Sequence, residues 1–122
     1  MYSELKQIIE QAWEERALLS EESVREAVRR TVDLVDKGQL RTAEPLDEER
    51  SLWQVNEWVK KAVILYFPLQ PMRKMQAGEL EWYDKMELKH GYEELGVRVV
   101  PHAVARYGAY IAPGAILMPS YV

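Results

Sequence analysis

Apolar residues recur at helical spacing in two stretches of the first 38 residues. The first stripe is Leu5, Ile8, Ile9, Ala12 and Trp13, and the second is Val24, Ala27, Val28, Thr31 and Val35. Each stripe follows the i, i+3, i+4, i+7 spacing that places side chains on one face of an α-helix. Ser3 and Ser20 are the expected N-caps, and Gly38 is the expected stop of the second helix. We therefore expect a helical hairpin whose two apolar faces are covered by other residues.

The pattern changes after Leu40. Residues 41–46 and 51–56 are short strand-like stretches separated by a turn at residues 47–50, which predicts a β-hairpin. The segment NEWVKKAVILYF at residues 56–67 then predicts a third helix that ends before Pro68. Apolar side chains cover most of its circumference and leave Lys60 and Lys61 on a narrow solvated edge. We expect this helix to be the most buried element of the first half.

Residues 68–96 contain weaker signals. Pro68 and Pro71 break regular structure, and residues 76–79 are the expected loop. Residues 80–88 are ambiguous, although their aromatic content favours a strand. Residues 91–95 predict a single helical turn closed by Gly96.

The last 24 residues repeat in units of six. From Val99 they are VVPHAV, ARYGAY, IAPGAI and LMPSYV. The first positions are Val99, Ala105, Ile111 and Leu117, and the fifth are Ala103, Ala109, Ala115 and Tyr121. This is the hexapeptide pattern of a parallel β-helix, in which the aliphatic first position points into the coil. Two ordinary strands joined by Pro/Gly turns are the alternative, but strands would alternate with a period of two.

Three hexapeptides complete one coil, so the repeat supplies little more than a single turn. Solenoid coils bury their apolar faces only against neighbouring coils, and about three are needed for stability. We therefore expect this chain to be a fragment of a longer solenoid protein. The predicted fold class is α+β, with an N-terminal helical and α+β domain at residues 1–98. The first, incomplete coil of a β-helix follows at residues 99–122.

Composition excludes several classes of function. The net charge of −4 is mild and lysine and arginine are dispersed, which argues against nucleic-acid binding. The absence of cysteine excludes disulfides and cysteine nucleophiles. The longest nearly apolar run, residues 62–69, is too short to span a bilayer, and no secretory signal is recognised. We expect a soluble, cytoplasmic protein.

The segment GVRVVPHAVARYGAYIAPGAILMPSYV resembles the tetrahydrodipicolinate N-succinyltransferases of diaminopimelate and lysine synthesis, and NEWVKKAVILYF and WYDKM look like the preceding elements of that family. The resemblance implies a homotrimer with a left-handed β-helix and active sites between subunits. It also implies succinyl transfer from succinyl-CoA, a co-substrate rather than a tightly bound cofactor, to the amino group of a dicarboxylate substrate.

Carried over by position, Arg98 in GVRVV matches the substrate-binding arginine of the family. A guanidinium can grip a carboxylate through two hydrogen bonds, so the assignment is chemically reasonable. The alternative is a solvated or salt-bridged arginine at the entrance to the coil. The resemblance places the catalytic carboxylate and the coenzyme A contacts beyond Val122, so no catalytic residue and no metal ligand is assigned here. His102 is interpreted as a surface residue, His90 as a turn residue and Asp84 as structural.

Two other functions stay open. The chain could be a non-catalytic module that trimerises or caps a β-helix, or part of a hexapeptide acyltransferase with another donor or amine. We expect the 122-residue chain alone to lack transferase activity, because the repeat is incomplete.

Overall fold

The computed structural model describes residues 1–122, and the chain divides into two compact units, residues 1–69 and residues 70–122. The fold is α+β, as predicted, with four α-helices and three two-stranded sheets. Unit 1 comprises α1 (Ser3–Glu14), a 3₁₀ helix (Arg16–Ser20), α2 (Glu22–Asp36), β1 (Ala43–Asp47), β2 (Leu52–Val55) and α3 (Glu57–Leu69). Unit 2 comprises β3 (Arg73–Ala77), β4 (Leu80–Asp84), α4 (Tyr92–Leu95), β5 (Arg98–Val99) and β6 (Ile116–Leu117). The predicted domain boundary between residues 98 and 99 stays a prediction.

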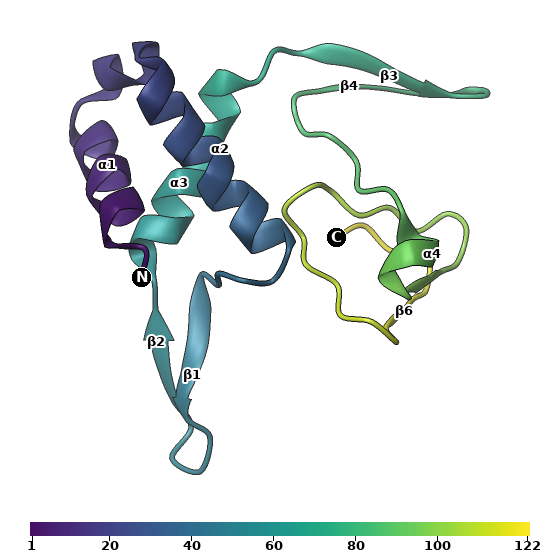
Figure 1. Cartoon of the computed structure of the whole chain (residues 1–122). Helices are drawn as coiled ribbons and strands as arrows, with labels where there is room; N and C mark the ends of the chain where they lie inside the picture. Colours follow the sequence, from purple (N-terminus) through teal and green to yellow (C-terminus); the bar gives the residue numbers. More distant parts are fainter. The chain divides into compact units, whose positions relative to one another are not determined.

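The core of unit 1 lies between α1, α2 and α3, each of which packs against the other two (Figure 1). Its largest fully buried side chains are Ile9, Leu65, Val28, Val59 and Thr31. The hydroxyl of Thr31 donates to the Ala27 carbonyl at 2.8 Å, which satisfies the one polar group among them. The two predicted stripes are confirmed, because their central residues form this core.

The two predicted N-caps are wrong, whereas the predicted helix stop is confirmed. Ser3 is the first residue of α1 and provides no side-chain cap. Ser20 ends the 3₁₀ helix, where its hydroxyl donates to the Ala17 carbonyl at 2.9 Å, and the N-cap position of α2 is held by Glu21, which makes no side-chain cap hydrogen bond. Gly38 has φ +73°, and its N–H donates to the Val35 carbonyl at 3.0 Å. The left-handed conformation that favours glycine thus ends α2.

Helix α3 continues through Pro68 to Leu69, past its predicted end. Its Lys60 is exposed as expected, but the prediction for Lys61 is wrong. The Lys61 ammonium lies 2.7 Å from the Glu10 carboxylate, and only 23% of its side chain is exposed. Helix α1 packs against α3 and shields Lys61 from much of the solvent. Although α3 is rich in apolar residues, no helix in the chain has the length and apolarity needed to cross a membrane.

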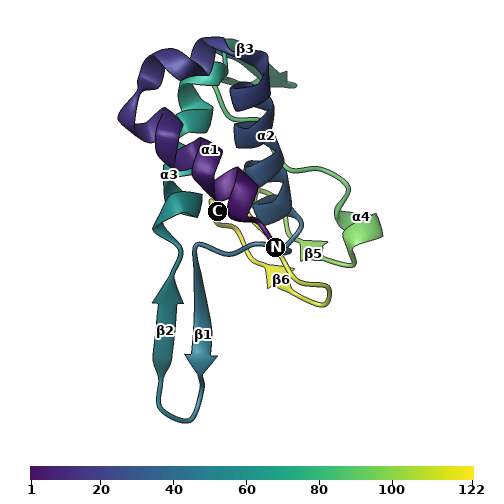
Figure 2. The same cartoon turned by 60° about the vertical axis from the view of Figure 1, so that its left-hand side comes forward.

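Strands β1 and β2 form the predicted hairpin, which extends away from the three helices (Figures 1 and 2). Ala43 pairs with Val55 and Pro45 with Trp53 on one face of the ribbon. Trp53 is 58% exposed, in contrast to the buried Trp58 of α3. Of these two tryptophans, only Trp58 therefore belongs to the core.

In unit 2 the first hairpin was only half predicted. Strand β4 and the turn at Gly78 agree with the sequence, and α4 is the expected single helical turn, closed by Gly96 at φ +70°. Strand β3 was not expected, and residues 76 and 77, expected in a loop, belong to it. All five residues of β3 pair with β4 in one antiparallel register.

The C-terminal segment winds so that residues 18 positions apart become neighbours. Strands β5 and β6 are parallel, with Arg98 opposite Ile116 and Val99 opposite Leu117. Val104 makes a further parallel bridge with Tyr121. Because β6 returns parallel to β5, the residues between them do not form a simple hairpin, as the alternative of two ordinary strands with tight turns would require.

Side chains from the first positions of the six-residue units gather inside this winding. The cluster consists of the buried Val97, Ala105 and Ile111, with Tyr92, Val99, Ala115 and Leu117 packed against it. Ile116, between Ala115 and Leu117 of this cluster, faces outward with 58% exposure. The winding therefore has a defined interior and exterior.

We expect Ile111→Ala to destabilise the chain by about 2–5 kcal/mol, because it removes a buried branched side chain from a small cluster. The matched control is Ile116→Ala, at an exposed position five residues later, which should change the free energy of unfolding by less than about 0.5 kcal/mol. Urea denaturation followed by circular dichroism measures both. Equal effects of the two substitutions would contradict the interior position of Ile111.

Candidate functional site

Arg98, the one ligand-binding residue expected from the sequence, lies on β5 with its side chain exposed. Its backbone N–H donates to the Ala115 carbonyl at 3.0 Å, which fixes the strand at this residue. Its neighbours Val97 and Val99 both pack into the interior cluster. Because side chains alternate along a strand, the guanidinium of Arg98 is directed outward. It makes no ion pair or hydrogen bond within the chain, so its donors are accessible to a ligand.

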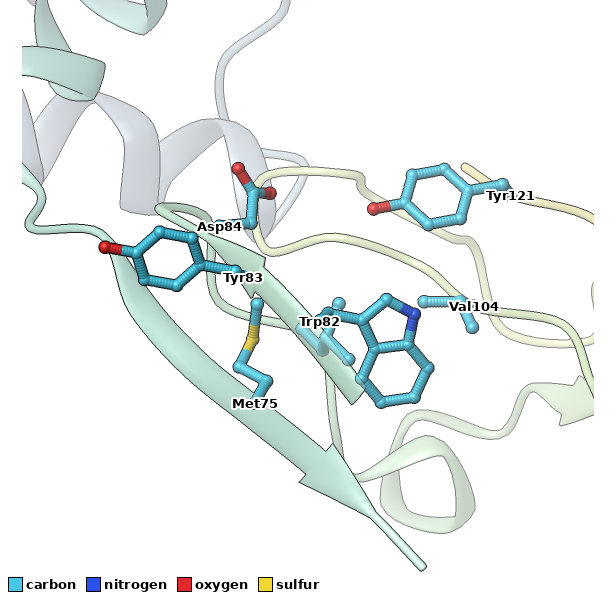
Figure 3. Close-up of a pocket in the computed structure, with 7 residues that line it drawn as sticks. Met75, Trp82, Tyr83, Asp84, Val104 and Tyr121 are labelled. Carbon is cyan, nitrogen blue, oxygen red and sulfur yellow. The ribbon is translucent and has the colours of Figure 1, made fainter. Parts of the chain in front are cut away.

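A second feature of unit 2, which sequence reasoning missed, is a pocket of about 200 Å³. Its lining residues are Met75, Trp82, Tyr83, Asp84, Leu88, Val104 and Tyr121 (Figure 3). They come from the β3–β4 hairpin, from the segment after it, and from the winding. No local motif joins these segments, so only the presence of aromatic residues in WYDKM hinted at a site.

An ion pair lies at the edge of this pocket. Nη2 of Arg106 donates to the Asp84 carboxylate at 2.5 Å, and both side chains are about one-third exposed. Backbone N–H groups, chiefly that of Lys85, together with Arg106 lower the pKa of Asp84. The charged partner of Asp84 is thus Arg106 in the same unit.

Arg106 also contacts the end of the chain. Its N–H donates to the Val122 carbonyl at 2.8 Å, and its guanidinium lies 5.8 Å from the centre of the Tyr121 ring. The hydrogen bond to Asp84 raises the pKa of Arg106, so the guanidinium stays charged. Its Nε is buried without a partner, which means that the pair uses Nη2 and not the two-nitrogen fork. The ion pair therefore connects the end of β4 to the winding.

The two histidines, His90 and His102, are both exposed, as expected. Neither lines the pocket beside Asp84. The groups of unit 2 that bear on binding are thus the exposed Arg98, the Asp84–Arg106 ion pair and a mainly apolar pocket.

The chain is thus of the α+β class, with a helical first unit and a second unit whose strands pair in parallel 18 residues apart. Comparison with known proteins identifies its family. Residues 4–69 match the family described as tetrahydrodipicolinate N-succinyltransferase N-terminal. The chain belongs to this family.

Curated relatives agree along the whole chain. They include proteins from Variovorax paradoxus (47% identical), Leptothrix cholodnii (50%) and Bordetella pertussis (48%), each matched over 100% of this chain. All three are named 2,3,4,5-tetrahydropyridine-2,6-dicarboxylate N-succinyltransferase. The chain covers 47% of each, so it spans about half the length of these relatives.

The lowered pKa of Asp84 predicts a pH dependence of stability. A carboxyl whose folded-state pKa lies below its ordinary value of 3.8 stabilises the fold above that pH, and this contribution is lost as the pH falls through the folded-state pKa. We expect the free energy of unfolding of Asp84→Asn to fall less steeply than that of the unmodified chain from about pH 4 to about pH 2.

Urea denaturation at several pH values measures this difference. Arg106→Gln, which removes the partner, should reduce the slope in the same direction. Parallel curves for Asp84→Asn and the unmodified chain would show that the ion pair does not stabilise the folded state.

Proposed function

We propose that this chain is the N-terminal part of an enzyme that transfers the succinyl group of succinyl-CoA to tetrahydrodipicolinate. The observation that carries the proposal is the match of the entire chain to relatives with that activity in their name. The reaction joins an amine nitrogen to the thioester carbonyl carbon. The carbon–sulfur bond breaks, coenzyme A leaves as the thiol, and the amine loses a proton to a base.

We further propose that residues 99–122 form the first coil of a left-handed β-helix. The 18-residue register between β5 and β6 supports this, because three six-residue walls make one coil. The shared cluster of Val99, Ala105, Ile111 and Leu117 supports it as well, since these are the first positions of four successive units. The left hand of the helix is taken from the family resemblance.

Arg98 is proposed to bind a carboxylate of the substrate. The β5–β6 pairing fixes its backbone, and its guanidinium has no competing partner in the chain. The substrate named for the relatives is a dicarboxylate, which suits the paired donors of a guanidinium. Binding of this kind orients the substrate amine relative to the thioester and contributes to the rate through proximity.

A homotrimer in the cytoplasm is the proposed assembly and location. Two large apolar side chains on the outside of the winding, Ile116 and Met118, are 58% and 63% exposed. Surfaces of this kind are commonly covered in assemblies. The same observation favours the second candidate function, a non-catalytic module that trimerises or caps a β-helix. Sedimentation measures the oligomeric state, and together with the activity measurements below it distinguishes the enzyme from the non-catalytic module.

We predict that the 122-residue chain alone does not turn over succinyl-CoA and tetrahydrodipicolinate. A chimera in which this chain replaces the matching N-terminal half of the Variovorax paradoxus relative should be active, because the two are 47% identical over that region. Release of the coenzyme A thiol measures turnover, and growth of a strain that requires diaminopimelate provides a second readout.

A chimera that folds and trimerises but never releases thiol would favour the non-catalytic module. A chimera that acylates only other amines, or uses only other donors, would favour a different hexapeptide acyltransferase. Turnover by the 122-residue chain alone would contradict the proposed division of residues.

In the active chimera, we predict that Arg98→Ala raises KM for tetrahydrodipicolinate roughly 10- to 100-fold, because one charged pair of hydrogen bonds is lost. KM for succinyl-CoA should change little. Arg98→Lys should give an intermediate KM, since lysine keeps the charge without the fork. Arg30→Ala, at an exposed arginine of α2, is the matched control and should leave both constants unchanged. An unchanged KM for tetrahydrodipicolinate in Arg98→Ala would remove the proposed role.

A further inference from the structure

The pocket beside Asp84 has the composition of a ligand site that the proposed reaction does not use. Three aromatic rings, those of Trp82, Tyr83 and Tyr121, line it together with aliphatic side chains. Figure 3 shows the Trp82 indole next to Val104 and the Tyr121 hydroxyl directed toward the Asp84 side of the pocket. Such a mixture of aromatic walls and one polar group is typical of small-molecule sites.

The size of the pocket limits what it can hold. At about 200 Å³ it is smaller than the usual drug-sized site. Apolar cavities of about 150 Å³ in proteins hold benzene, so this volume suits one or two fused rings. Trp82 and Tyr121 offer ring faces that stack on or meet the edge of another ring.

The charge of the lining favours one kind of ligand. Asp84 is the one charged residue among those that line the pocket. Its carboxylate is held ionised by backbone N–H groups and by Arg106, which is not itself a lining residue. Because Arg106 already neutralises this carboxylate, an amine gains by sharing its oxygens, whereas a ligand carboxylate finds no cation among the lining residues.

We infer that this pocket binds a small aromatic amine, with the ring between Trp82 and Tyr121 and the amino group at Asp84. The inference goes beyond the proposed function, because neither Arg98 nor acyl transfer takes part in it. Its chemistry is opposite to that of Arg98, which requires an anion.

The experiment uses three probes of one shape: tryptamine, indole and indole-3-acetate. Methyl groups of methionine are observed by NMR, and Met75 is the only methionine that lines the pocket. We expect tryptamine to shift the Met75 signal selectively and to bind about fivefold more tightly than indole, the factor for one charge pair near 4 Å in water. Indole-3-acetate should bind more weakly than indole.

Matched variants test the contacts separately. Trp82→Ala should abolish the Met75 shift, whereas Trp53→Ala, at an exposed tryptophan of the other hairpin, should leave it unchanged. Asp84→Asn should retain indole binding and lose the preference for tryptamine. Arg98→Ala should bind tryptamine as the unmodified chain does, so failure of this inference is distinct from failure of the proposed function.

Three results would overturn the inference. One is equal shifts at Met75 and at Met1, which lies outside the pocket, since this would mean non-specific binding. Another is equal affinity for the three probes. The third is a Met75 signal that depends on protein concentration and not on tryptamine, because a second copy of the chain would then occupy the pocket.

Discussion

The parallel pairing of β5 with β6 is the constraint on which the second half of the chain depends. Backbone hydrogen bonds between these strands bring Arg98 and Val99 next to the residues 18 positions later, Ile116 and Leu117. This register places the first positions of successive six-residue units in one cluster, and it places the residues between them outside. The outward direction of Arg98 follows from the same register, because Val97 and Val99 on either side of it are drawn inward. A shift by one residue would exchange the two faces and would bury the guanidinium without a partner.

The interior cluster is small, and a second set of interactions holds the winding in place. The segment after β4 runs beside residues 105–107, where Lys89 donates to the Ala105 carbonyl and Tyr107 donates to the Glu87 carbonyl, both at 2.8 Å. Arg106 lies at the centre of this contact. Its backbone contacts Val122 and its side chain contacts Asp84, so one residue joins the hairpin, the winding and the end of the chain. The pocket exists because these segments are held together at a fixed spacing.

The sequence predicted those elements whose apolar residues are periodic. The stripes of α1 and α2 were recognised because a spacing near 3.6 has no other simple explanation, and the hairpin β1–β2 because a turn separates two short strand-like segments. Strand β3, with the sequence RKMQA, has no β-branched or aromatic residue, so only its pairing with β4 makes it a strand. Ser20 has a cap-like sequence context, but it belongs to the 3₁₀ helix, and Glu21 takes the N-cap position of α2. Lys61 was predicted to be solvated because its ion-pair partner, Glu10, is 51 residues away and no local pattern joins the two.

The proposed role of Arg98 comes from the family resemblance, whereas the pocket is visible only in the folded chain. The number of segments that each site needs explains this difference. Arg98 needs only to be exposed and unpaired, which a short motif and the β5–β6 register together provide. The pocket needs residues from three separate segments, and no single segment contains its pattern. The two sites also cannot be copies of each other. A carboxylate that satisfies Arg98 would face the ionised Asp84 in the pocket, and an amine that satisfies Asp84 would be repelled at Arg98. Under the two proposals, unit 2 separates an anion-binding surface at Arg98 from an amine-binding pocket at Asp84, so the two ligands do not compete for the same side chains.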